Sequence, residues 1–124
     1  MDIVIDTSSI IFGFSNHINI FGIVRSEGMA PMIPECVIRE LAGIGNGTGK
    51  YAKYARTALS DISGHDGMII RGSGSDRLGS ADSWMLRNAQ RRGMGVCTND
   101  TGLRKRLREK NVKVFTLTRK GRLR

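Results

Sequence analysis

Four of the eleven acidic residues follow short apolar segments. Asp6 and Asp100 come almost directly after such a segment, Glu40 lies in the helical stretch after another, and Asp82 opens a helical stretch beyond a longer loop. Carboxylates that gather at one place repel each other by roughly 4 kcal/mol per pair at about 4 Å and an effective dielectric near 20. Such a group needs either bound protons or a cation. Because all the donors would be oxygens, the ion that fits them is hard, Mg²⁺ or Mn²⁺.

The elements that would position these acids alternate between apolar runs and helical patterns, which is typical of a parallel α/β sheet. We expect strands at 3–5, 31–33, 68–70, 95–98 and 112–117. We expect helices at 16–26, 35–44, 48–62, 80–92 and 100–110. Ligands of open parallel sheets bind at the carboxyl ends of the strands. The four acids are therefore expected on one rim of the sheet.

Helical spacing at 100° per residue indicates where three of these side chains point. Asp82 and Asp100 each fall on the same side as the apolar residues of their own helix, so both are expected to point inward. Glu40 lies at the edge of the apolar stripe of its helix. Trp84 lies opposite Asp82 and is expected to contact a second layer or a dimer interface.

A structural explanation is open for each acid taken singly. Asp near a helix start commonly accepts hydrogen bonds from free backbone N–H groups and suits the helix dipole. An Asp after a strand can also close a turn. The argument for a shared site rests on the placement of all four on one rim.

The charge of the chain is concentrated in its C-terminal third. The net charge is +9, and residues 87–124 hold 13 basic and 2 acidic residues. This balance favours a polyanionic partner: nucleic acid, an anionic membrane surface or an acidic protein. A solvated helix face is the alternative explanation for the basic run. Phe115 is the single aromatic residue of this third, so base stacking is not expected there.

Other features of the chain bound its class. At 124 residues it forms one domain. Cys36 and Cys97 are too few for a disulfide framework or a zinc site, and both are expected to be buried in a reducing compartment. The N-terminus lacks the basic region of a signal peptide, and no apolar run approaches membrane length. We therefore expect a soluble, cytoplasmic protein. The Gly-rich segment 43–50 lacks the spacing of a phosphate loop.

Four segments in this order resemble a PIN domain: IVIDTSSIIF, IPECVIREL, GSADSWMLRNA and VCTNDTGLRKRL. The resemblance covers 2–117, and the most specific pieces are the first strand with its Asp and the strand that ends in Thr-Asn-Asp. It implies a three-layer α/β/α fold with a central parallel five-stranded sheet. We divide the chain into a PIN-like nuclease domain at 1–117 and a basic tail at 118–124.

The resemblance also implies a set of site residues. By position, Asp6, Glu40, Asp82 and Asp100 would hold Mg²⁺ or Mn²⁺, while Ser8, Thr98 and Asn99 would orient a carboxylate, a water or a phosphate. Some members carry a further acid where this chain has Ser83, so the number of metals stays open. Asp76 is a candidate that we do not expect to assist.

The activity that the resemblance implies is metal-dependent endoribonuclease cleavage, leaving a 5′-phosphate and a 3′-hydroxyl. Within the family the chain also resembles short archaeal-type members related to nucleases that process small-subunit rRNA and, more loosely, toxin ribonucleases of toxin–antitoxin pairs. The RNA could be rRNA, tRNA or mRNA, and candidate partners are an antitoxin, a ribosome-assembly protein and a second copy of the chain. The main alternative is a non-catalytic RNA-binding or scaffold module; a small-ligand domain is a weaker one. Six basic residues are expected to contact RNA: Arg104, Lys105, Arg106, Arg108, Arg119 and Lys120.

Overall fold

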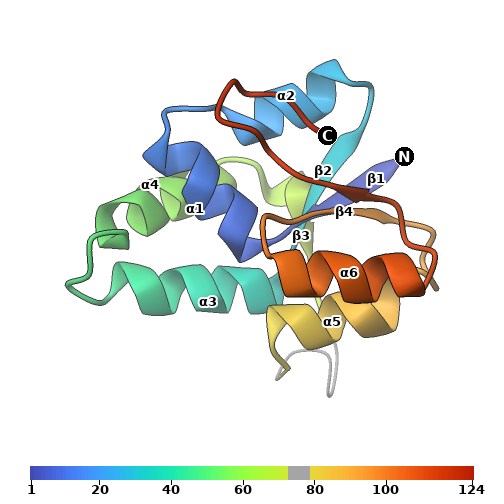
Figure 1. The fold of residues 1–124 in the computed structure, drawn as a ribbon. Coiled ribbons are helices and arrows are strands. Elements are labelled where there is room, and N and C mark those ends of the chain that lie inside the picture. The colour runs from blue at the N-terminus through green and yellow to red at the C-terminus, as the bar shows by residue number, and fades with distance from the viewer. Residues whose placement is uncertain (73–78) are drawn as a thin grey trace.

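The computed structural model describes residues 1–72 and 79–124, which fold around a five-stranded parallel sheet (Figure 1). The strand order is β3-β2-β1-β4-β5. The strands are β1 (Asp2–Ile5), β2 (Ala30–Pro34), β3 (Ile69–Ile70), β4 (Gly95–Cys97) and β5 (Val114–Phe115). The α/β fold with a central parallel sheet of five strands is therefore as the sequence predicts.

Six α-helices and one 3₁₀ turn connect the strands. They are α1 (Thr7–Ser15), α2 (Ile20–Ser26), α3 (Glu35–Gly45), α4 (Ala52–Ser63), η1 (Asp66–Met68), α5 (Ala81–Asn88) and α6 (Thr101–Glu109). Figure 1 shows α5 and α6 side by side on one side of the sheet and α1, α2 and α4 on the other. Helix α3 packs mainly against α4 and also contacts α5. Among the described helices, none is long and apolar enough to cross a membrane.

Strand β1 is the centre of the fold. Its residues Ile3, Val4 and Ile5 are fully buried, as expected for a strand covered on both faces. It pairs with β2 on one side and with β4 on the other, where Ile5 lies opposite Cys97. The chain leaves β1 toward β2 and later returns to the opposite side of β1. The carboxyl ends of β1 and β4 therefore flank the switch point where parallel sheets bind ligands.

The expected helix at 16–26 is wrong at its start. The structure has α1 directly after β1, then a break, and α2 only from Ile20. Helix α1 contains Thr, Ser, Ile and Gly residues of modest or poor helix propensity, and burial of its apolar face overrides that preference. His17 has a φ of 58°, which interrupts the helix, and the Asn19 side chain accepts a hydrogen bond from the Gly22 N–H at 3.1 Å to begin α2.

The expected basic tail at 118–124 is not an extended arm. Residues 116–124 turn back on themselves, with Leu117 and Leu123 paired in an antiparallel bridge. The Thr116 N–H donates to the Arg124 carbonyl at 2.8 Å, and the Arg124 N–H donates to the Thr116 carbonyl at 2.9 Å. Gly121 takes a φ of 77° at the tip, a conformation that costs little only for glycine.

Trp84 belongs to the core of this chain, with 1% of its surface exposed. It therefore fits the expected contact with a second layer and cannot present its ring to a dimer partner. The Arg92 guanidinium lies 5.4 Å from the ring centroid. Cys36 and Cys97 are both buried free thiols, as predicted.

A tight contact at Gly95 provides a test of the sheet. A Cβ there would lie 2.6 Å from Ile3 Cδ1 and 3.3 Å from the Lys113 carbonyl oxygen. We expect Gly95→Ala to lower the free energy of unfolding by about 1–3 kcal/mol through overpacking. The matched control is Gly43→Ala in α3, where nothing lies within 4 Å, and which should stabilise by about 0.5–1 kcal/mol. Urea unfolding measures both, and an unchanged midpoint for Gly95→Ala would contradict the packing.

Candidate active site

Asp6 is the most buried of the four acids, with 4% of its surface exposed. It follows β1, and its backbone N–H continues the ladder by donating to the Cys97 carbonyl at 2.9 Å. Its Oδ2 accepts hydrogen bonds from Thr98 Oγ1 at 2.7 Å and from Ser8 Oγ at 2.8 Å. Two adjacent strands and α1 thus fix this carboxylate at the switch point.

Burial raises the pKa of Asp6, and the negative charge of Asp82 raises it further, whereas the hydroxyl hydrogen bonds from Thr98 and Ser8 oppose the shift. The buried carboxylate is therefore costly to ionise in the absence of a nearby positive charge. A cation placed beside it would remove that cost.

Glu40 connects three helices at the same rim. Its Oε1 accepts from Thr7 Oγ1 at 2.7 Å, and its Oε2 accepts from the Ala81 N–H at 3.0 Å. The carboxylate projects from α3 and so ties the first residue of α1 to the first residue of α5. Glu40 therefore holds the helix start on which Asp82 lies, besides adding its own charge to the site.

Asp82 lies at the edge of the buried face of α5, not at its centre. That face consists of Ala81, Trp84, Met85 and Asn88, while Asp82 is only half-buried. Partial burial raises the pKa of Asp82, and the charges of Asp100 and Glu40 raise it further, against an opposing effect of Arg106. Asp82 therefore interacts electrostatically with the other three acids: the charges of Asp100 and Glu40 raise its pKa, and its own charge raises the pKa of Asp6.

Asp100 is exposed, so it is not buried under its helix as expected, although it lines the same cavity as Asp6. It is the N-cap of α6: its Oδ1 accepts from the Leu103 N–H at 3.0 Å. Its own N–H donates to Thr98 Oγ1 at 3.1 Å, which links it to the hydroxyl that holds Asp6. The structural explanation for this acid is therefore correct, and it leaves the other carboxylate oxygen at the rim.

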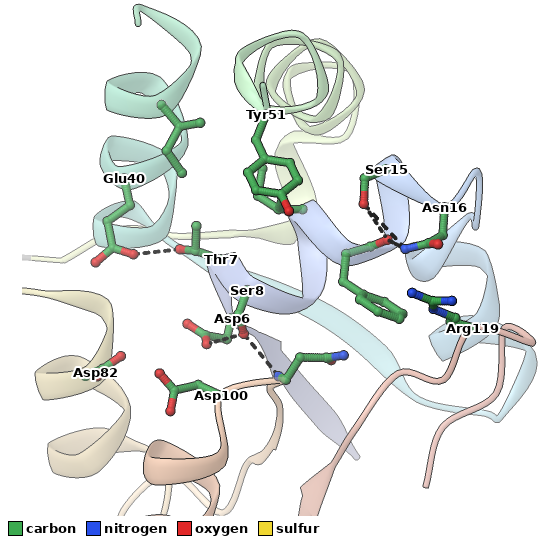
Figure 2. A pocket seen from close by; sticks show the side chains of 14 residues that line it. Asp6, Thr7, Ser8, Ser15, Asn16, Glu40, Tyr51, Asp82, Asp100 and Arg119 are labelled. Carbon is green, nitrogen blue, oxygen red and sulfur yellow. Dashed lines mark hydrogen bonds between the residues drawn. The ribbon is translucent and has the colours of Figure 1, made fainter. Parts of the chain in front are cut away.

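One cavity of ≈ 740 Å³ brings all four acids together. Figure 2 shows Asp82 and Asp100 pointing toward the same space as Asp6, with Glu40 beside them. The opposite side of the cavity carries Ser15, Asn16 and Arg119, and Tyr51 lies above (Figure 2). The cavity thus has an acidic half and a half without acids among its described lining residues.

The donor chemistry of the acidic half fits a hard divalent cation, because its lining offers carboxylate, hydroxyl and amide oxygens and neither His nor Cys. The side chains do not converge as placed: within residues 1–72 and 79–124, no three or more acidic, His or Cys side chains form a group that could hold one ion. An ion would therefore have to draw Asp82 and Asp100 toward Asp6. Asp76 lies outside the described residues.

The six basic residues expected to contact RNA lie in different places. Arg119 lines the main cavity, whereas Arg104, Lys105 and Arg108 line a separate hollow of ≈ 440 Å³ on α6. Arg106 is exposed and lowers the pKa of Asp82 by its charge, and Lys120 is exposed at the hairpin. Arg104 donates to Thr116 Oγ1 at 2.5 Å, so it also holds the start of the hairpin.

Sequence reasoning missed two contributors to the site. Thr7 was passed over because nothing in the sequence pairs it with Glu40, 33 residues away. Tyr51 was missed because it directly follows the Gly-rich segment 43–50, which has the composition of a loop between two helices. Asn99, which was expected to support the site, lines the cavity and also has a structural role. Its Oδ1 accepts from Ser9 Oγ at 2.7 Å, and its Nδ2 donates to the Leu117 carbonyl at 3.0 Å.

Comparison with known proteins identifies a family and structures with a similar fold. A family model described as a PIN like domain matches residues 3–120. The chain is similar to the structure of the PIN domain endonuclease Utp24, with 24% identity and a TM-score of 0.76 over 98% of this chain and 90% of that one. It is also similar to a domain of a functionally unknown protein from Methanocaldococcus jannaschii (19% identity, TM-score 0.61, 94% and 91% covered).

A third similar structure is VapBC-1 from nontypeable Haemophilus influenzae, with 14% identity and a TM-score of 0.62 over 92% of this chain and 96% of that one. No curated protein sequence matches the chain. At these identities the solved structures show a shared fold.

Proposed function

Because the chain belongs to the PIN-like domain family, we propose that it is a metal-dependent endoribonuclease that hydrolyses RNA phosphodiester bonds at the acidic cavity. The observation that carries the proposal is that four carboxylates line one cavity at the switch point of the sheet. They lie at the end of β1, in α3, in α5 and at the N-cap of α6, positions that are far apart in the sequence. Keeping like charges together is costly, and a bound cation would offset that cost.

Asp6, Glu40, Asp82 and Asp100 would hold Mg²⁺ or Mn²⁺. When bound, such an ion supplies Lewis-acid stabilisation and lowers the pKa of a water. The chain contributes orientation: Ser8 and Thr98 fix one carboxylate oxygen of Asp6, and Glu40 fixes the starts of α1 and α5. Arg119, on the other side of the cavity, offers positive charge to the RNA backbone.

The experiment that tests the proposal uses a circular single-stranded RNA with Mn²⁺, with Mg²⁺ and with EDTA. An endonuclease opens the circle in the presence of metal and leaves it intact in EDTA. The ends of the product should be a 5′-phosphate and a 3′-hydroxyl. Degradation of a linear RNA without opening of the circle would contradict the endonuclease proposal.

The second candidate function is a non-catalytic RNA-binding module. It is favoured by the hydrogen bonds that give Glu40 and Asp100 structural roles and by the lack of a converged ligand group among the described residues. Binding of the circle without opening it under any metal condition would support this candidate.

The proposal includes two alternative biological roles: rRNA processing and a toxin-type ribonuclease. The similar structures include the PIN domain endonuclease Utp24 and VapBC-1. A small antitoxin-like gene next to this one would favour the toxin role, and a ribosome-assembly partner the processing role. Homodimerisation and a cytoplasmic location belong to the same proposal, and light scattering of the purified protein tests the first.

The basic face of α6 provides a prediction about binding. Lys105 and Arg108 are exposed and lie beside each other over the same hollow. Replacing both by Ala should reduce the slope of log K against log salt by about 1.4, since each phosphate contact on a single strand contributes about 0.7. The control is Lys53→Ala on α4, which should leave the slope unchanged. Filter binding in EDTA measures the slope, and equal slopes for the double variant and the wild type would remove α6 from the RNA path.

A further inference from the structure

The half of the cavity without acids has the chemistry of a nucleotide subsite. Its described lining includes the exposed ring of Tyr51, the guanidinium of Arg119, and the polar side chains of Ser15 and Asn16. Figure 2 shows Arg119 and Asn16 close together and separated from Asp82 and Asp100 by the width of the cavity. Positive charge, an aromatic face and an amide thus lie next to the acidic half.

Tyr51 exposes a large aromatic side chain that is not part of the hydrophobic core of the described chain. It is one of two large hydrophobic residues in the described chain that are strongly exposed, with 42% of its surface accessible. The Lys50 ammonium lies 4.9 Å from its ring centroid and adds positive charge at that edge. An aromatic ring that is held beside a cation and opens into a cavity can stack a base on its free face.

Arg119 has no acidic partner among the described residues. Its backbone belongs to a closed hairpin. Its hairpin is closed by the Thr118 N–H, which donates to the Arg122 carbonyl at 2.8 Å. At Gly121 a Cβ would lie 3.4 Å from Ile23 Cδ1, so the tip of the hairpin packs near α2. Arg119 thus lines the cavity from a turn with a fixed backbone. An Arg side chain without an acidic partner is well suited to bind a phosphate.

We propose that the acid-free half of the cavity binds one nucleotide of the RNA next to the bond that is cut, with its base stacked on Tyr51 and its phosphate on Arg119. The inference rests on the proposed function in taking RNA as the ligand. The sequence predicts no base stacking in the basic C-terminal third. That prediction does not concern Tyr51, which reaches the site from the segment before α4.

The consequence is a requirement for an unpaired base, because a base within a duplex cannot stack on a side chain. Asn16 lies beside Arg119 (Figure 2), on the side proposed for the phosphate, and its Nδ2 donates to the Phe12 carbonyl at 2.8 Å.

The test measures binding in EDTA, so that it does not depend on cleavage. The probes are a fluorescent RNA hexamer and a hexamer of the same ribose phosphates without bases. Tyr51→Ala should weaken binding of the RNA by about tenfold to a hundredfold and leave binding of the abasic probe unchanged, whereas Tyr51→Phe should bind both as the wild type does. Arg119→Ala should weaken binding of both probes. Tyr54→Ala and Arg122→Ala are the matched controls.

The results that would overturn the inference are specific. If Tyr51→Ala weakens both probes equally, or neither, the ring does not stack a base. If Arg119→Ala matches Arg122→Ala, the guanidinium does not hold the phosphate. A selective effect of Tyr51→Ala in a protein that opens no circular RNA would keep the subsite and reject the endonuclease; cleavage with no effect of Tyr51→Ala would do the reverse.

Discussion

Asp6→Asn is expected to reduce metal-dependent RNA cleavage by about 10³-fold, near the upper end of the effect of removing one electrostatic contact from an active site. The substitution removes the charge and keeps the shape. Thr98 and Ser8 both donate to the same oxygen of Asp6, so the amide oxygen of Asn can accept both hydrogen bonds. The fold should therefore survive, and initial cleavage rates in Mn²⁺ together with a thermal melt measure the two effects.

Asp66→Asn is the matched control for this prediction. Asp66 is exposed on η1, where its Oδ1 accepts from Arg71 at 2.8 Å, and its loss should leave cleavage unchanged. If Asp6→Asn retained the wild-type rate, Asp6 would not take part in the chemistry. If it lost both activity and its thermal transition, the loss would be one of folding.

Asp82→Asn is expected to change stability and activity in opposite directions. Cleavage should fall by about 10²-fold, whereas the metal-free protein at neutral pH should melt at a higher temperature than the wild type. The reason is that partial burial, and then the charges of Asp100 and Glu40, raise the pKa of Asp82 above the usual 3.8. Asn removes this repulsion. A melt without metal and a rate with Mn²⁺ measure the pair of effects.

The pH dependence follows from the same shifts. The folded chain holds the protons of Asp6 and Asp82 more tightly than the unfolded chain, whose carboxyls titrate near 3.8. Their contribution to stability is complete below that value and is lost as the pH rises through the raised folded-state pKa values. Asp82→Asn should flatten this loss, and Mn²⁺ should offset it at neutral pH by binding only the folded state. A metal-free protein whose stability does not fall through this range would contradict the account.

Local pattern accounts for the part of the fold that sequence reasoning predicted. Strands β1 and β4 are short apolar runs followed by acids, and α3, α4 and α6 have regular apolar faces, so periodicity placed them. The placement of Asp6 and Asp100 at strand ends then brought both to one rim. These features depend on residues close together in the chain.

The features that sequence reasoning missed depend on contacts between distant segments. Helix α1 forms against its intrinsic propensity because its apolar side is buried. The direction of Asp100 was set by its helix cap, which a count of helical angles does not include. Residues 116–124 fold back into a hairpin, and Tyr51 lines the cavity. Both features bring together segments whose contact no local sequence pattern predicts.

The most direct test of the central claim compares wild type with Asp100→Asn on one labelled RNA, with Mn²⁺ and with EDTA. Asn is as good an N-cap as Asp, so this variant keeps the hydrogen bond to Leu103 and removes only the charge. We expect metal-dependent cleavage by the wild type, strongly reduced cleavage by Asp100→Asn, and a cooperative thermal transition in both proteins. Cleavage at the wild-type rate by Asp100→Asn, or cleavage by the wild type in EDTA, would contradict the account of an acidic metal site.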